Sequence, residues 1–142
     1  MRDIKFRAWD AQNKEMCQVL MIYPGNKVIE LQWIDKNKNI TLSTTASKEG
    51  VELMQFTGFQ SVDQCEIYEN DILHVIRRVT SFNAVVKWRQ QSGGFYLSVI
   101  DTGRYIEFNE LGQAGDGEKI YLSDCRIIGN IFENPELHET TC

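Results

Sequence analysis

Apolar and polar residues alternate with a period of two along most of this chain, in short segments separated by turn-forming residues. Residues 4–9 show the pattern: Ile4, Phe6 and Ala8 fall on one face of an extended strand, and the residues between them fall on the other. The segments are rich in β-branched and aromatic residues, which favour strands over helices. The sequence therefore predicts an all-β protein in which half-buried strands are joined by hairpins.

The expected strands cover residues 4–9, 15–23, 28–34, 40–43, 52–58, 72–79, 84–88, 95–100, 104–108, 120–122 and 126–132, with a further short strand before Asn70. Pro24-Gly25-Asn26 is the clearest turn, because Pro restricts φ and both Gly and Asn tolerate positive φ. Polar residues 44–50 are expected to form a connection, residues 61–64 a turn and residues 90–94 a hairpin loop. Residues 109–119 hold three glycines without periodicity and are predicted to form a mobile loop. Pro135 is expected to end strand pairing, and Leu137 to pack the segment after it.

A chain of 142 residues is long enough to bury a core as one domain with at most a small elaboration. No stretch approaches the apolar length of a membrane span, and the charged start at residues 1–5 is unlike a signal peptide. Four cysteines stand far apart, at Cys17, Cys65, Cys125 and Cys142, which indicates reduced thiols more than a zinc site. We therefore expect a cytoplasmic protein that does not associate with membranes.

Four segments carry a family resemblance: Lys-Phe-Arg-Ala-Trp-Asp at 5–10, Leu-Met-Gln-Phe-Thr-Gly at 53–58, Glu-Ile-Tyr-Glu-Asn-Asp-Ile-Leu at 66–73, and Ile-Ile-Gly-Asn-Ile-Phe-Glu-Asn-Pro-Glu-Leu at 127–137. In this order they resemble the YopX family of uncharacterised phage and prophage proteins, from about residue 3 to residue 138. The resemblance implies an SH3-like small barrel over residues 52–138. It also implies an N-terminal antiparallel β hairpin layer over residues 1–51, packed on the barrel as one compact unit, with residues 139–142 as a mobile tail. A bacterial host cell is the location that follows from it, and no family activity can be carried over.

Asn70 and Asp71 are interpreted as a structural turn. Members of the family that the chain resembles usually have Gly at the position of Asn70, which suggests a turn with positive φ. Asn tolerates that conformation better than most other residues, so the substitution supports a role in the backbone.

For each candidate residue, a structural role is favoured over a catalytic one. His74 could act as a general base, but no nucleophile motif accompanies it, so a hydrogen-bonded strand histidine is the better interpretation. Glu66, Glu69 and Asp71 could bind a divalent cation, but solvated turn carboxylates are favoured. The glycines of residues 109–119 match no phosphate-binding pattern. We therefore predict no enzymatic activity, no cofactor and no metal.

The candidate binding face consists of Arg77, Arg78, Lys87, Trp88 and Arg89, with Phe82 beside them, on strands that are expected to be neighbours. Cationic and aromatic side chains on a barrel face can bind single-stranded nucleic acid, although an ordinary charged sheet face is the more common case. The chain has a net charge of −5 and no basic run, which argues against a general duplex binder.

Acidic residues are concentrated in residues 101–142, where 3 Lys and Arg stand against 9 Asp and Glu for a net charge of −6. Glu107, Glu110, Asp116 and Glu118 could attract a basic partner, or could simply aid solubility. We expect a non-enzymatic module that binds a protein partner or self-assembles through strand edges as a homo-oligomer. The alternative is a barrel that binds single-stranded nucleic acid.

Overall fold

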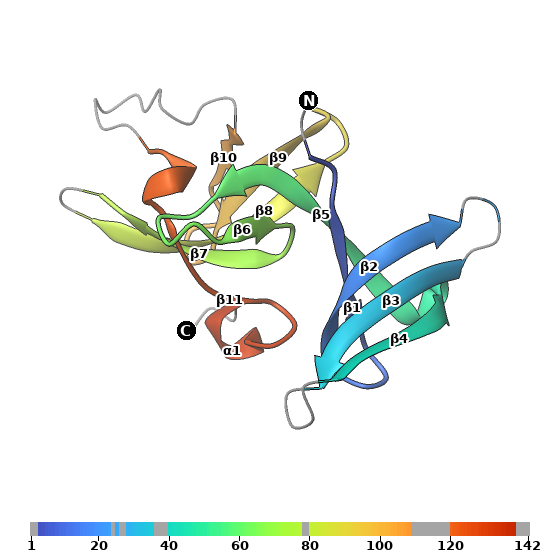
Figure 1. Ribbon diagram of the computed structural model, residues 1–142. Helices are drawn as coiled ribbons and strands as arrows, with labels where there is room; N and C mark the ends of the chain where they lie inside the picture. Colours follow the sequence, from blue (N-terminus) through green and yellow to red (C-terminus); the bar gives the residue numbers. More distant parts are fainter. Residues whose placement is uncertain are drawn as a thin grey trace. The chain divides into compact units, whose positions relative to one another are not determined.

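The computed structural model describes residues 3–23, 25, 28–35, 40–77, 80–108 and 120–138. Nearly all of its regular structure consists of antiparallel strands (Figure 1), so the all-β prediction is confirmed. The chain divides into two compact units, residues Met1–Phe56 and Thr57–Cys142. The division falls within a strand that begins at Val51.

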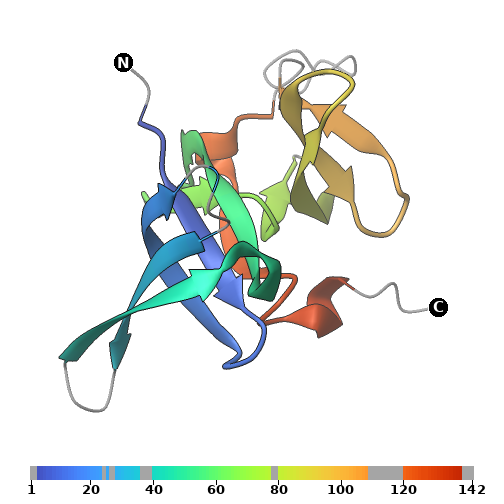
Figure 2. The same cartoon turned by 90° about the vertical axis from the view of Figure 1, so that its right-hand side faces the viewer.

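Strands β1 to β5 lie side by side in one antiparallel sheet, in the spatial order β4-β3-β2-β1-β5. Their bounds are β1 (Phe6–Asp10), β2 (Glu15–Tyr23), β3 (Val28–Asp35), β4 (Ile40–Ser47) and β5 (Val51–Gln60), and a 3₁₀ turn (Lys48–Gly50) precedes β5. β3 and β4 run antiparallel over their full lengths (Figures 1 and 2). The buried residues Ala8, Cys17, Ile29 and Leu31 form the core of this first unit.

The turn between β1 and β2 is held by one carboxylate. Asp10 Oδ1 accepts the backbone N–H groups of Gln12 and Asn13 at 3.0 and 3.2 Å, and Asp10 Oδ2 accepts the Asn13 side chain at 2.7 Å. Burial opposes ionisation, but these hydrogen bonds outweigh it and lower the pKa of Asp10. Lys14 completes the turn with a φ of 54°.

The second unit contains a five-stranded antiparallel sheet with the order β10-β9-β8-β7-β11. Its elements are β7 (Asp71–Ile76), β8 (Ser81–Arg89), β9 (Gly94–Val99), β10 (Tyr105–Glu107), a 3₁₀ turn (Leu122–Asp124), β11 (Arg126–Asn130) and α1 (Pro135–His138). The short strand β6 (Glu66–Tyr68) follows β5 in the first sheet. A 3₁₀ turn followed by a closing strand that pairs with β7 fits the SH3-like architecture.

One face of the five-stranded sheet covers the largest core in the described part of the chain. Leu73, Val75, Ala84, Val86, Phe95 and Leu97 project to this face, and Ile67, Ile120, Leu122 and Cys125 pack against them. The register explains why: Leu73 lies opposite Ala84 on β8, and Val86 lies opposite Leu97 on β9. Residues at alternate positions of each strand therefore share this core.

Several predicted boundaries were wrong. β4 extends to Ser47, so most of the expected polar connection at 44–50 is strand, because Thr and Ser pair well in a sheet even without apolar alternation. Residues 120–122 do not form a strand, since a 3₁₀ turn begins at Leu122 and buries that side chain. The last strand, β11, ends at Asn130 and not at residue 132, and the chain after it enters α1 at Pro135, a position where the missing N–H of proline costs no hydrogen bond. Ile4 is 66% exposed and lies before β1, not in it.

Candidate functional site

The turn that carries Asn70 and Asp71 is built by backbone hydrogen bonds. Asn70 has a φ of 67°, the left-handed conformation that favours Gly or Asn. Asp71 Oδ2 accepts the backbone N–H of Tyr68 at 2.8 Å, and the Asn70 N–H donates to the carbonyl of Val86 at 2.8 Å. Asp71 is 1% exposed, so its carboxylate stabilises the turn. We expected this carboxylate to be solvated, and that expectation was wrong.

A second asparagine organises the end of β11. Asn130 Oδ1 accepts the backbone N–H groups of Phe132 and Glu133 at 3.1 and 2.9 Å. The Asn130 N–H donates to Asn134 Oδ1 at 3.3 Å. Gly129 lies against the Asn134 side chain, and a Cβ at Gly129 would stand 2.7 Å from Asn134 Cγ, closer than atoms pack. Glycine is therefore required here by a close approach.

The four segments that carry the family resemblance thus pair with one another. Residues 6–10 of β1 pair with residues 51–55 of β5, and residues 71–74 of β7 pair with residues 126–130 of β11. The N–H of Ile131 also donates to the carbonyl of Asn70 at 3.1 Å. These contacts make the four segments part of the scaffold of the fold.

Arg89 lies at the centre of a cluster formed by β8, β9 and β10. Its guanidinium carbon is 3.9 Å from the ring centroid of Tyr105 and 5.2 Å from that of Tyr96. Arg89 Nη1 is 2.9 Å from Glu107 Oε1, and the two tyrosine rings meet edge to face at 6.1 Å. Hydrogen bonding to Tyr105 first, and the charge of Glu107 after it, raises the pKa of Arg89 despite partial desolvation. The guanidinium is therefore charged and held in one position.

Trp88 belongs to a different cluster on the opposite face of β8. Its ring packs edge to face on Phe95 at 5.0 Å, and Phe95 contacts Phe108 at 5.8 Å. Phe108 in turn meets Phe59 at 5.9 Å. Trp88 is 47% exposed while Phe95 is buried, so the tryptophan extends the core to the surface at this end of the sheet.

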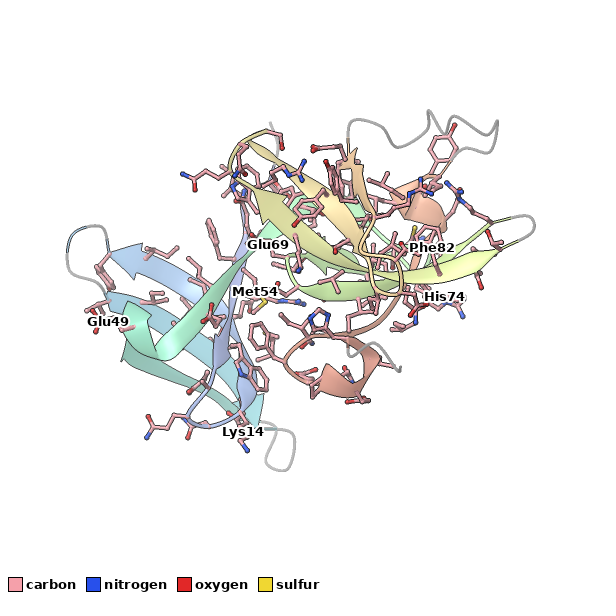
Figure 3. The ribbon with its side chains drawn as sticks, turned by 180° about the vertical axis from the view of Figure 1, so that it is seen from behind. Lys14, Glu49, Met54, Glu69, His74 and Phe82 are labelled. Carbon is pink, nitrogen blue, oxygen red and sulfur yellow. The ribbon has the colours of Figure 1, made fainter. Side chains whose placement is uncertain are left out.

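The structure brings together only part of the predicted binding face. Lys87 and Arg89 share a face of β8, and Trp88 lies between them in sequence but on the other face. Arg77 follows β7 and lies over the Phe82 ring at 5.7 Å (Phe82 is labelled in Figure 3). Phe82 and Arg89 are seven residues apart on one strand, or roughly 23 Å, so Arg77 is at the far end of the sheet from Arg89. Arg78 lies outside the described residues.

The remaining candidate residues make contacts with neighbouring side chains. His74 Nδ1 lies 2.8 Å from Asn83 Oδ1 on the neighbouring strand (His74 is labelled in Figure 3). Tyr68 donates its hydroxyl to Glu66 at 3.0 Å. No group of three His, Cys, Asp or Glu side chains in the described ranges could bind a metal ion. The predicted loop at 109–119, the predicted tail at 139–142 and most of the predicted turn at 24–26 lie outside those ranges.

Thiol environments differ along the chain. Cys17 and Cys125 are buried and Cys65 is exposed, and all three are free thiols. Burial, with a smaller effect of Asp124, raises the pKa of Cys125 to about 11. Burial also raises the pKa of Cys17, with Asp10 and Glu15 adding to it. Buried thiols of high pKa are unreactive, which is the behaviour of core residues and not of nucleophiles.

Sequence comparison with a protein-family model then decides the family, because the model described as YopX protein matches residues 5–139. The chain belongs to the YopX family. Two solved structures are similar over 98% of this chain and 100% of their own: EF1440 from Enterococcus faecalis (24% identity, TM-score 0.58) and YopX from Bacillus subtilis (19% identity, TM-score 0.57). They support the fold alone. A comparison with curated protein sequences found no match. Within the described residues, no helix is long and apolar enough to cross a membrane.

Proposed function

We propose that this YopX-family chain is a non-enzymatic module that binds a protein partner through the rim of β8, β9 and β10. We define the rim as the end of the sheet where Trp88 reaches the surface on one face and Arg89, Tyr96 and Tyr105 lie on the other face. The observation that carries the proposal is that Arg89 lies over the rings of both Tyr96 and Tyr105 while Tyr105 and Trp88 remain 53% and 47% exposed. Trp, Tyr and Arg are the residue types that contribute most binding energy at protein interfaces.

Preorganisation strengthens the case for the rim. Trp88 is supported by the buried Phe95, and Arg89 is fixed by Glu107, whose side chain is 18% exposed. Side chains that are already ordered lose little conformational entropy when a partner binds. The acidic residue Glu107 therefore serves to position Arg89, and the role that we assigned to Glu107, Glu110, Asp116 and Glu118 as an electrostatic handle remains a prediction.

The test is affinity capture of tagged protein from bacterial lysate, with and without nuclease. Trp88→Ala and Tyr105→Ala should each lose most of a nuclease-resistant protein partner. Tyr121→Ala is the matched control, because Tyr121 is also an exposed aromatic residue, at 45%, and precedes the 3₁₀ turn at Leu122. Equal loss of capture in all three variants, or retention in the two rim variants, would contradict the proposal.

A nucleic-acid role is the second candidate, and the stacking of Arg89 on two aromatic rings beside Lys87 favours it. Glu107 opposes this role, because its carboxylate already neutralises Arg89 at 2.9 Å. Binding of a fluorescent single-stranded oligonucleotide, measured by anisotropy over a salt series, tests this role. Loss of a salt-sensitive complex in Arg77→Glu with Arg89→Glu would support it, and unchanged affinity would remove it.

We further propose that the protein is encoded by a phage or prophage and acts in the cytoplasm of a bacterial host. The family resemblance of the four segments supports this origin, and the free thiols of Cys17, Cys65 and Cys125 are consistent with a reducing compartment. Detection of the protein in the soluble fraction after prophage induction tests it.

A further inference from the structure

The two sheets of the described structure end in four edge strands, and three of them carry features that discourage pairing with another chain. β6 and β10 are only three residues long, and each contains a glutamate. β11 contains Arg126 and a register shift between Ile127 and Gly129. Short length, charge and bulges are the usual means of protecting an edge.

β4 has none of these features. It is the last strand of its sheet, and its residues are Ile-Thr-Leu-Ser-Thr-Thr-Ala-Ser, without charge, proline or glycine. All of its residues from Ile40 to Ser47 pair with β3 in continuous register without a bulge. Among the described residues no strand pairs with its other side. A long, regular and uncharged edge is a template for another strand.

We propose that β4 pairs with β4 of a second copy of this chain, in antiparallel orientation about a two-fold axis. A two-fold axis perpendicular to a continuous sheet places one residue of the strand opposite the same residue of the second copy. The middle of β4 (Ile40–Ser47) falls between Ser43 and Thr44, so the longest pairing is centred on one of these two residues. With Thr44 at the centre, residues 41–47 of one copy lie opposite residues 47–41 of the other. Either centre brings only uncharged residues together, and Thr–Thr and Thr–Ser pairs stabilise such contacts.

A second copy is favoured over an unrelated strand because the edge is complementary to itself. An antiparallel partner would need a matching length, no like charges opposite each other and no proline, and β4 meets these conditions with itself. The pairing would join two sheets into one continuous sheet. It uses residues separate from the β8–β10 rim, so it stands independently of the proposed function.

Cysteine crosslinking tests the register. In an antiparallel pair, residues directly opposite each other have Cα atoms about 4.5–5.5 Å apart, which is within the range of a disulfide. The test uses a background with Cys65→Ser and Cys142→Ser, so that these two thiols cannot crosslink. Ser43→Cys or Thr44→Cys should form a covalent dimer under mild oxidation much faster than Ser92→Cys, an exposed control in the β8–β9 turn. Crosslinking no faster than in the Ser92→Cys control would overturn the proposal.

Charge complementation gives a second, independent test at whichever of the two residues crosslinks. Substitution of that residue by Lys or by Glu places like charges opposite each other and should weaken the dimer about fivefold in sedimentation equilibrium. An equimolar mixture of the Lys and Glu variants should restore the association as a heterodimer. Circular dichroism checks that each variant remains folded. A protein that is monomeric at all concentrations, or a mixture that does not associate more than its components, would overturn the proposal while leaving partner capture through the rim untouched.

Discussion

Substitution of Gly129 by Ala tests whether the close approach at the end of β11 is essential for stability. A Cβ at this position would stand 2.7 Å from Asn134 Cγ and 3.1 Å from Asn134 Cβ. The Asn134 side chain would have to turn away, and Asn134 Oδ1 would lose the hydrogen bond that it accepts from the Asn130 N–H at 3.3 Å. The surrounding structure is ordered by further bonds to Asn130, so it cannot easily relax.

The expected loss follows from these two effects. Overpacking by one methyl group costs about 1–3 kcal/mol, and loss of the hydrogen bond costs about 1 kcal/mol. We therefore expect Gly129→Ala to lower the free energy of unfolding by about 2–4 kcal/mol. Asn134→Ala alone should cost about 1 kcal/mol, because it removes the bond without a clash. In the Asn134→Ala background, Gly129→Ala should cost only about 1 kcal/mol, since only the 3.1 Å contact with Cβ remains.

The wild type, the two single variants and the double variant form a double-mutant cycle. Their urea unfolding, followed by near-ultraviolet circular dichroism, gives the coupling energy between positions 129 and 134. Gly94→Ala is the matched control, because a Cβ at Gly94 in β9 meets no atom within 4 Å. It should be neutral or slightly stabilising. Additive losses in the double variant would refute the reasoning, as they would show that Gly129 is not required by contact with Asn134.

Three further outcomes follow from the second unit. Asn70→Gly should change the free energy of unfolding by less than about 0.5 kcal/mol, while Asn70→Ala should cost about 1–2 kcal/mol because of the φ of 67°, as measured by urea unfolding. Leu97→Ala should cost about 3–5 kcal/mol in the same assay because Leu97 is fully buried, and a loss below 1 kcal/mol would contradict its place in the core. The pKa of Cys125, raised to about 11, favours the folded state below the thiol's unfolded pKa, and this contribution is lost as pH rises through 11. The wild type should therefore lose stability relative to Cys125→Ala over that interval, and parallel pH profiles would exclude the effect.

Much of the strand pattern could be predicted from the sequence. The expected strand at 15–23 is β2, and those at 28–34, 84–88 and 95–100 differ from β3, β8 and β9 by a few residues at their ends. Alternation is a local property of an extended chain, so it can be recognised in sequence. The segment 120–122 was misassigned because its apolar residues Ile120 and Leu122 are buried against a distant sheet, and burial of this kind does not distinguish a strand from a 3₁₀ turn.

The candidate site was only partly predictable. Arg89 and Trp88 stood out because a cation and an aromatic residue are adjacent in the sequence. The partners of Arg89 did not, because Glu107 is 18 residues away and reaches Arg89 only after β9 pairs with β8 and β10 pairs with β9. The sequence also grouped Arg77 with Arg89, although the two residues lie near opposite ends of β8. The sequence correctly predicted that the strands before and after Arg78 are neighbours in the sheet. Which residues lie at the same level, and which share a face of the sheet, depends on the pairing register.

The sequence by itself determined the all-β class, the left-handed turn at Asn70 and the family, because each depends on local alternation, a local backbone preference or short motifs. Tertiary structure decided which strands pair, which edges stay open and where charges are matched. β11 returns to β7 across about fifty residues of chain, and β4 is left at an edge, as consequences of long-range packing and loop closure. The Arg89 cluster and the open edge of β4 are therefore properties of the fold, invisible until distant segments are placed side by side.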